Sequence, residues 1–471
     1  MKTGGVILKN LLSLASAEVV ARIVGFLTTI YLGRVLGAEG FGKLGFAQSF
    51  NYYFIILAVS GLNVFGIREI AKRQEETRTL TGQIFGLKII TTVLSFFLLI
   101  GLIFMMPKPA DVKTLMIVLA CSVFTNGLTM EWILSGLEKM EWIAIVGLIR
   151  NGVYLILVFT LVHGTADIFF VGVAILLPEI VAVVLMLFLS RKHFGSFSIS
   201  FDTSAWPSIL RASIPLAFTS FLLQIYYQID IVMLGFWTTD TITGWYVSAS
   251  TIILSLLGLG SLLGSTLYPT LSRLFHESPQ QAEKLLHYTT RFVITLSLPI
   301  AAGGIVLAPR IIEFVYGSEY VSAVTSFQIL LFSIVTSFIS IPYMTTLIAR
   351  DERKYFVAAT AAGAVVNCAL NFLLIPMYLH VGAAWATVAA EVVVFCISYY
   401  YGSKSVVFSM IKLIPRPLIA AIAMAWFASL LSFHVGIIIL LSAMVYVVIV
   451  GLIGGFSLSD IKMIRSALSR S

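Results

Sequence analysis

Apolar runs of about 20 residues recur along almost the whole chain, with short polar segments between them. A run of that length crosses the hydrocarbon core of a bilayer as a helix, because 20 residues rise about 30 Å. The pattern therefore predicts an all-α polytopic membrane protein with about 14 transmembrane helices. The predicted spans cover residues 11–32, 44–66, 84–105, 114–134, 142–162, 168–190, 213–236, 246–269, 290–308, 324–348, 356–376, 382–402, 416–433 and 435–455.

The basic residues alternate between the two sides of this predicted bundle. With a cytoplasmic N-terminus, 23 of the 30 Lys and Arg fall in inner segments and 5 in outer segments, and Lys88 is counted with the inner basic segment that begins at Arg68. Cytoplasmic loops carry an excess of Lys and Arg. The asymmetry therefore predicts a multi-pass protein of the cell membrane with both termini in the cytoplasm. Arg22 and Arg150 remain inside spans.

Composition excludes several classes of protein. Only 11% of residues are charged, against roughly 25% in soluble domains. The net charge of +8 comes from short loops, so we expect no nucleic-acid partner. The sequence holds no GxxxxGK[ST], HExxH or GxSxG motif, and its histidines are scattered. We therefore expect no catalytic residue, metal or cofactor, and transport coupled to protons, sodium or the membrane potential.

Two shifted matches predict an internal repeat. A glycine-rich turn predicted from Gly33 to Gly45 coincides, 202 residues later, with a turn from Gly235 to Gly244. Residues 178–181 (PEIV) match residues 390–393 (AEVV) at a shift of 212, which predicts an insertion in the second half. Such repeats are typical of secondary transporters, with substrate bound between the halves. We predict six-helix lobes at 1–195 and 196–405 around a central cavity, then two helices and a basic cytoplasmic tail at 406–471.

Ionisable residues inside spans are candidates for function, because a charge at membrane depth costs at least about 2.5–3.5 kcal/mol. Glu18 and Arg22 lie four residues apart on one helix, so they either pair to lock that helix or line a polar cavity. Arg150 either faces the same cavity or extends to the membrane surface. Glu179 and Glu391 are either matched structural sites or part of transport.

Asp230 shares its span with Gln224, Gln228 and two tyrosines, a polarity that is hard to place against lipid. Arginine suits phosphate because its planar guanidinium donates bidentate hydrogen bonds and stays charged. The residues predicted to line the transport cavity are Arg22, Glu18, Arg150, Asp230, Gln224, Glu131 and Glu391.

Five stretches, in order along the chain, carry a resemblance to a known family. They are residues 32–37 (LGRVLG), 230–235 (DIVMLG), 244–249 (GWYVSA), 371–376 (NFLLIP) and 382–387 (GAAWAT), the last followed by Glu391. With them the chain resembles the multidrug/oligosaccharidyl-lipid/polysaccharide exporter superfamily, in its polysaccharide-transporter branch of Wzx-type oligosaccharide flippases.

The resemblance implies two six-helix lobes, alternating access, and movement of a polyprenyl-pyrophosphate-linked oligosaccharide from the inner to the outer leaflet. The expected partners are that lipid-linked saccharide, membrane lipids and polysaccharide synthesis enzymes on the basic inner loops. The small number of cations at depth, Arg22 and Arg150, favours a capsule or teichuronic-type unit over a peptidoglycan precursor.

Two other functions remain as alternatives. A cation-coupled multidrug exporter of the same superfamily would use Asp230 or Glu18 as the carboxylate that exchanges a proton or sodium for drug. A membrane saccharide polymerase or ligase is disfavoured, because such enzymes are expected to carry a long outer loop with acid or base residues, and the outer loops here are short.

Overall fold

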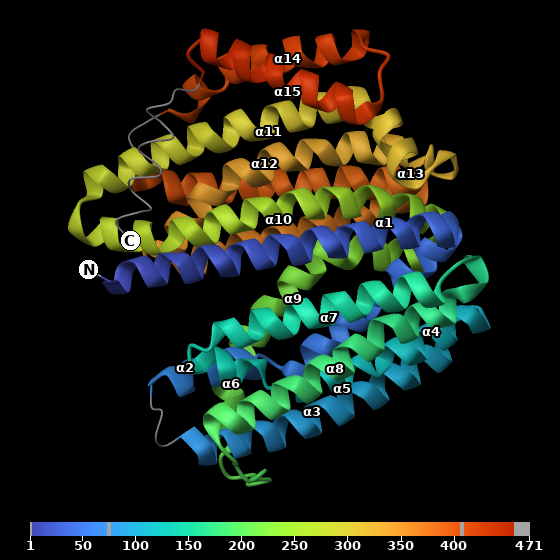
Figure 1. Ribbon diagram of the computed structural model, residues 1–471, viewed down its shortest axis with the longest axis vertical. Coiled ribbons are helices and arrows are strands. Elements are labelled where there is room, and N and C mark those ends of the chain that lie inside the picture. The colour runs from blue at the N-terminus through green and yellow to red at the C-terminus, as the bar shows by residue number, and fades with distance from the viewer. Residues whose placement is uncertain (1, 73–76, 406–408, 456–471) are drawn as a thin grey trace. The chain divides into compact units, whose positions relative to one another are not determined.

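The computed structural model describes residues 2–72, 77–405 and 409–455; the side chains of residues 2–22, Thr77 and Ser405 lie outside that description. The regular elements in these ranges are helices (Figure 1). The α-helices are α1 (Lys2–Val59), α2 (Leu62–Lys72), α3 (Thr77–Met105), α4 (Ala110–Ala120), α5 (Ser122–Leu128), α6 (Glu131–Gly136), α7 (Met140–Leu161), α8 (Ile168–Phe194), α9 (Trp206–Trp237), α10 (Asp240–Glu277), α11 (Pro279–Tyr316), α12 (Ala323–Ala349), α13 (Arg353–Gly402), α14 (Pro415–Leu430) and α15 (Val435–Leu452).

The expected multi-pass membrane fold is confirmed. Within the described ranges, 11 helices are long and apolar enough to cross a membrane, or up to 12 if α1 from Ile23 and α2, bent by 41°, count as one broken span. The number of 14 stays a prediction. It depends on α1 and α13, each of which joins two predicted spans across a non-helical residue. The 50 residues of α13 would extend about 75 Å, more than twice the hydrocarbon thickness of a bilayer.

The break in α1 involves fewer residues than the sequence predicts. Only Gly37, at φ 67° and ψ 177°, leaves the helical region, so the turn predicted from Gly33 to Gly45 is wrong in extent. Glycine adopts a positive φ without the steric penalty that a Cβ brings, whereas its neighbours keep helical backbone bonds. In the second half the corresponding break separates α9 from α10, where the Thr239 side chain accepts a hydrogen bond from the Ile242 N–H.

Element boundaries follow the predicted repeat. Gly37 corresponds to Thr239 at the shift of 202, and the starts of α4 and α8 correspond, within one residue, to the start of α12 and to the break at Leu379 in α13 at the shift of 212. The insertion falls where α10 runs on to Glu277 and α11 begins directly at Pro279. Both halves are therefore built on one helical plan.

The chain forms two compact units, Met1–Gln228 (unit 1) and Ile229–Ser471 (unit 2). In unit 1, α8 packs against α4, α5 and α7, and a buried core around Trp132 and Ile133 joins α2, α3 and α6. In unit 2, α12 packs against α10, α11 and α13. The lobe boundaries at 195 and 405 remain predictions, and residues 456–471 of the predicted basic tail lie outside the described residues.

The helices α14 and α15 dock on α11 in unit 2. The Arg291 guanidinium donates to the carbonyls of Gly455 (2.8 Å) and Gly454 (2.7 Å), just past the end of α15. The Tyr446 hydroxyl donates to the Thr295 carbonyl at 2.6 Å. Carbonyls at a helix end have no intrahelical partner, so the Arg291 guanidinium satisfies the carbonyls that follow α15. Together with the bond from Tyr446 to α11, these contacts fix the helix pair to unit 2.

Candidate functional site

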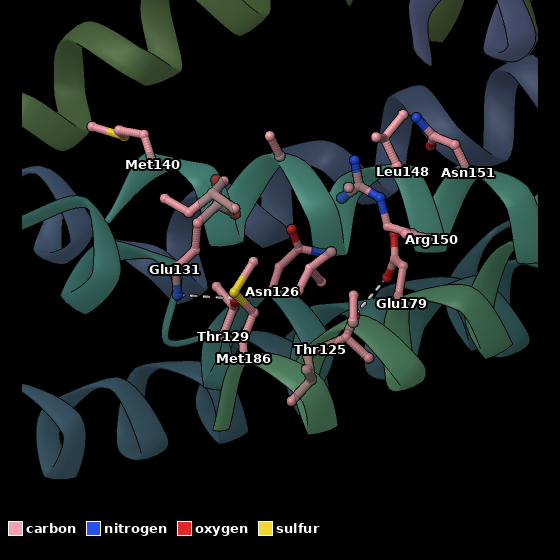
Figure 2. A pocket seen from close by; sticks show the side chains of 16 residues that line it. Thr125, Asn126, Thr129, Glu131, Met140, Leu148, Arg150, Asn151, Glu179 and Met186 are labelled. Carbon is pink, nitrogen blue, oxygen red and sulfur yellow. Dashed lines mark hydrogen bonds between the residues drawn. The ribbon is translucent and has the colours of Figure 1, made fainter. Parts of the chain in front are cut away.

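Unit 1 contains a cavity of about 550 Å³ between α5, α6, α7 and α8 (Figure 2). Its polar lining residues are Thr125, Asn126, Thr129, Glu131, Arg150, Asn151 and Glu179, and its larger apolar ones are Met140, Ile143, Val183 and Met186. Because these helices belong to membrane-span candidates, the cavity places ionisable groups inside candidate spans. Such groups mark functional sites more often than structural ones.

One end of the cavity holds Arg150, the single cation among its described lining residues, beside the Glu179 carboxylate. Thr125 Oγ1 donates a 2.5 Å hydrogen bond to Glu179 Oε2, which ties α5 to α8. Arg150, on α7, lies beside Glu179 and interacts with it electrostatically, without a close ion pair in the described structure (Figure 2). The Arg150 side chain is exposed. Its five N–H donors are therefore available to a ligand in the cavity.

The other end carries Glu131. Thr129, with ψ 142°, is extended and separates α5 from α6, so Glu131 occupies the first position of α6. The Glu131 side chain is exposed, and its carboxylate has no hydrogen bond or ion pair within the described part of the chain. Figure 2 shows Glu131 and Met140 at the opposite end of the cavity from Arg150 and Asn151. The cavity thus has a cationic end and an acidic end.

A buried lysine supports the acidic end. Lys88, on α3, is 0% exposed; its Nζ donates to Asn63 Oδ1 at 2.8 Å and to the Thr129 carbonyl at 3.2 Å, and lies 5.7 Å from the Trp132 ring centroid. The count of basic residues groups Lys88 with the inner segment that begins at Arg68, although the predicted span 84–105 contains it, and the structure places it inside α3. The stretch from Arg78 continues α3, and the lysine instead satisfies the carbonyl that the α5–α6 break exposes.

Asp230 lies in a separate, fully buried cluster of unit 2. Its carboxylate accepts from the Tyr246 hydroxyl (2.5 Å), from Thr387 Oγ1 (2.7 Å) and from Asn371 Nδ2. Asn371 Nδ2 also donates to Asn367 Oδ1 at 3.0 Å. The neighbouring Asn371 Oδ1 has no hydrogen-bond partner among the described residues. A buried carboxylate with neutral partners and a free amide oxygen is suited to holding a proton or a small cation.

Glu391 and Gln224 lie in other surroundings. Glu391 is 6% exposed in unit 2 and accepts a hydrogen bond from Ser337 Oγ. Gln224 lies on α9 in unit 1, where its main-chain carbonyl accepts a hydrogen bond from the Tyr53 hydroxyl at 3.5 Å. The structure therefore brings Arg150 and Glu131 of the predicted site to one cavity and places Asp230 and Glu391 in unit 2. The side chains of Glu18 and Arg22 lie outside the described residues, so their pairing stays a prediction.

Two family models match the chain. The polysaccharide biosynthesis protein family matches residues 7–275, more than half of the chain. The model of the lipid II flippase MurJ matches residues 149–464. The chain belongs to the polysaccharide-transporter branch of the multidrug/oligosaccharidyl-lipid/polysaccharide exporter superfamily.

Similar proteins agree with this membership. The chain is 23% identical over 399 residues to a putative O-antigen transporter of Escherichia coli K12, covering 82% of this chain and 94% of that protein. Its fold is similar to that of the lipid II flippase MurJ in an inward closed conformation, with a TM-score of 0.77, 18% identity and coverage of 94% and 98% of the two chains. An inward-facing multidrug transporter of the same superfamily gives a TM-score of 0.66 at 15% identity, with 82% and 95% covered.

Some of the cavity residues can be identified from the sequence alone. Arg150, Glu131 and Glu179 were detectable as charges inside predicted spans. The sequence does not distinguish Asn126, Asn151 and Thr129 as cavity residues, because amides and hydroxyls in membrane helices commonly join helices by hydrogen bonds. Lys88 could have been found from its place eleven residues into the apolar helix α3.

Proposed function

We propose that this protein flips a polyprenyl-pyrophosphate-linked oligosaccharide from the inner to the outer leaflet by alternating access, for assembly of a cell-surface polysaccharide. Membership of the polysaccharide-transporter branch supports the proposal, as does the O-antigen transporter relative. The observation that carries it is the polar cavity of unit 1, which contains Arg150 and Glu131 within membrane-spanning helices. A saccharide headgroup crosses hydrocarbon only where protein groups replace its hydration.

Arg150 is the proposed contact for the pyrophosphate, together with Arg22. Guanidinium groups form bidentate, charge-assisted hydrogen bonds with phosphate oxygens and stay protonated at physiological pH. The neighbouring Glu179 is held by Thr125 and partly balances Arg150 when no substrate is bound. A balanced cation also releases substrate more readily, which turnover requires.

The Asp230 cluster is the proposed coupling site. Occupation of this carboxylate by a proton or a sodium ion changes the charge of a buried cluster in unit 2, where Tyr246, Thr387 and Asn371 join α9, α10 and both halves of α13. The helices that contact Asp230 therefore face a negative charge when the carboxylate is empty and a neutralised group when a proton or sodium ion is bound. A bound ion shifts a conformational equilibrium only through such a difference.

The proposed setting is the cytoplasmic membrane with both termini in the cytoplasm, supported by the distribution of Lys and Arg. The substrate reaches such a protein from the inner leaflet, where enzymes assemble it. Polysaccharide synthesis enzymes are the proposed partners of the basic inner loops.

The proposal is tested by replacing Arg150 in cells that depend on this protein for surface polysaccharide. We expect Arg150→Ala to reduce surface polysaccharide at least about tenfold while membrane levels stay unchanged, because about 1.4 kcal/mol of lost binding is a tenfold effect. Arg211→Ala, at an exposed position of α9, is the matched control and keeps export. Normal export in the Arg150 variant would remove this residue from the mechanism.

A multidrug exporter is the second candidate, favoured by the buried Asp230 carboxylate and by the fold shared with the multidrug transporter. Cells with and without the gene would then accumulate a fluorescent cationic drug to different levels. We expect equal accumulation, together with a loss of surface polysaccharide in cells that lack the gene.

A further inference from the structure

Comparing the two repeats shows which residues of the unit 1 cavity have a counterpart in unit 2 and which are found in unit 1 alone. The pair Thr125–Glu179 recurs as Ser337–Glu391, with the same spacing of 54 positions in each half. The other cavity residues do not recur. At the shift of 212, Asn126, Glu131 and Arg150 correspond to Phe338, Tyr343 and Ala362.

The positions in unit 2 are filled by apolar packing. Phe338 is 2% exposed and Tyr343 is 1% exposed. The same helical plan is therefore stable with aromatic side chains where unit 1 has an amide and a carboxylate. Polar groups at membrane depth that the fold does not need are best explained by a ligand.

The two ends of the cavity suit different parts of one ligand. Met140 and Arg150 lie ten residues apart on α7, which separates the acidic and cationic ends by about 15 Å. Arg150 is the single cation among the described residues that line the cavity. A phosphate group is therefore favoured at the Arg150 end and disfavoured beside Glu131.

The acidic end has the chemistry of a sugar site. Glu131 and Asn126 offer acceptors and donors for hydroxyl or amide groups, and Met140 and Met186 offer apolar contact for the C–H face of a ring. The Glu131 carboxylate has no cation paired with it within the described structure. A sugar carboxylate placed there would face the like charge of Glu131 without a cation in the cavity lining beside it, which weakens binding.

We propose that the Glu131 end of the cavity binds the sugars nearest the diphosphate, and that Glu131 selects neutral or amino sugars over acidic ones. This inference rests on the proposed function, because it takes the lipid-linked diphosphate as the group held near Arg150. The charge of the cavity thus favours lipid-linked saccharides whose sugars near the diphosphate are neutral or amino sugars.

Binding of three probes to the purified full-length protein tests the assignment. The probes are farnesyl diphosphate, a farnesyl-diphosphate-linked trisaccharide of N-acetylglucosamine, and the same conjugate with glucuronic acid as its third sugar, because a single sugar is too short to reach from Arg150 to Glu131. We expect the wild type to prefer the N-acetylglucosamine conjugate over the glucuronic acid conjugate by about tenfold or more. Glu131→Gln should remove most of that preference by strengthening binding of the acidic conjugate, and Glu141→Gln, which removes an exposed carboxylate outside the cavity lining, should keep it.

The outcomes separate the two proposals. An unchanged preference in Glu131→Gln, or none in the wild type, would overturn the sugar assignment while farnesyl diphosphate still bound. Failure of all three probes to bind the wild type would overturn the flippase proposal as well. Thermal unfolding of each variant shows whether it is folded. If Glu131→Gln is unstable, Asn126→Asp, which adds a second carboxylate to the cavity lining between Glu131 and Arg150, should increase the preference, and an unchanged preference would count against the assignment.

Discussion

Thr125 donates a hydrogen bond to Glu179, and 212 residues later Ser337 donates one to Glu391. The first pair joins α5 to α8 in unit 1, and the second joins α12 to the part of α13 that follows its break at Leu379 in unit 2. The surroundings differ: Glu179 is partly exposed to a cavity, whereas Glu391 is 6% exposed. The same hydrogen bond is therefore part of the buried packing in unit 2, whereas in unit 1 it lies at the edge of a polar cavity.

This difference predicts unequal effects of the same substitution. Glu391→Ala should lower the free energy of unfolding by about 2–4 kcal/mol, because it leaves a buried hole and takes the acceptor from Ser337. Glu179→Ala should cost less than about 1 kcal/mol, since solvent in the cavity replaces the lost contact. Thermal unfolding of both variants in the same detergent measures the difference. Equal losses would contradict the distinction between the two sites.

The sequence predicts the repeat because glycine-containing turns and apolar runs recur at fixed shifts, and residues 178–181 and 390–393 are enough to align the two glutamates. It does not predict the cavity, because no local pattern specifies which faces of α5, α6, α7 and α8 converge. The Asp230 cluster shows the same limit. Thr387 and Asn371 lie 157 and 141 positions from Asp230, and only the tertiary fold brings them to its carboxylate.

Two features of the structure differ from the sequence prediction for physical reasons. The glycines from Gly33 to Gly45 read as a turn, but only Gly37 adopts a positive φ, because a helix tolerates glycine wherever packing supports it. Lys88 is counted with the inner basic segment because basic residues precede it, but it is buried inside α3. A lysine is accepted inside α3 because the break after Leu128 exposes a carbonyl that needs a donor.

Lys88 should therefore be a stability determinant of unit 1. Lys88→Met keeps the volume of the side chain but leaves Asn63 Oδ1 and the Thr129 carbonyl without their donor. Each buried orphan acceptor costs about 1–3 kcal/mol, so the melting temperature should fall. Adding Asn63→Leu removes one of the two acceptors and should restore part of the loss. A Lys88→Met protein as stable as the wild type would show that these hydrogen bonds contribute nothing net.

The loop between α8 and α9 predicts an acid-sensitive contact. Asp202 accepts hydrogen bonds from the Ser204 hydroxyl (2.6 Å), the Ser204 N–H (3.0 Å) and Gln83 Nε2 (3.2 Å), which hold the pKa of its carboxyl below the usual 3.8. Its folded pKa is lower than its unfolded pKa, so the stabilisation is fully present above the unfolded value. It is lost as the pH falls through the folded value.

Asp202→Asn should consequently unfold at a lower temperature than the wild type near neutral pH, and the difference should shrink below about pH 4. Melting curves of both proteins across this range measure the effect. A difference that stayed constant down to acid pH would show that the charge of Asp202 does not act through these hydrogen bonds.

The most direct test of the central claim is flipping by the purified protein in liposomes. A polyprenyl-pyrophosphate-linked N-acetylglucosamine with a fluorescent label is placed in both leaflets, and an impermeant reductant then bleaches the label that is accessible from outside. We predict that bleaching rises from about half of the label in empty liposomes to nearly all of it with the wild-type protein, since flipping re-supplies the outer leaflet, and that Arg150→Ala returns it to about half. Bleaching that stays at half with the wild-type protein, under every ion gradient applied, would contradict the assignment as a flippase.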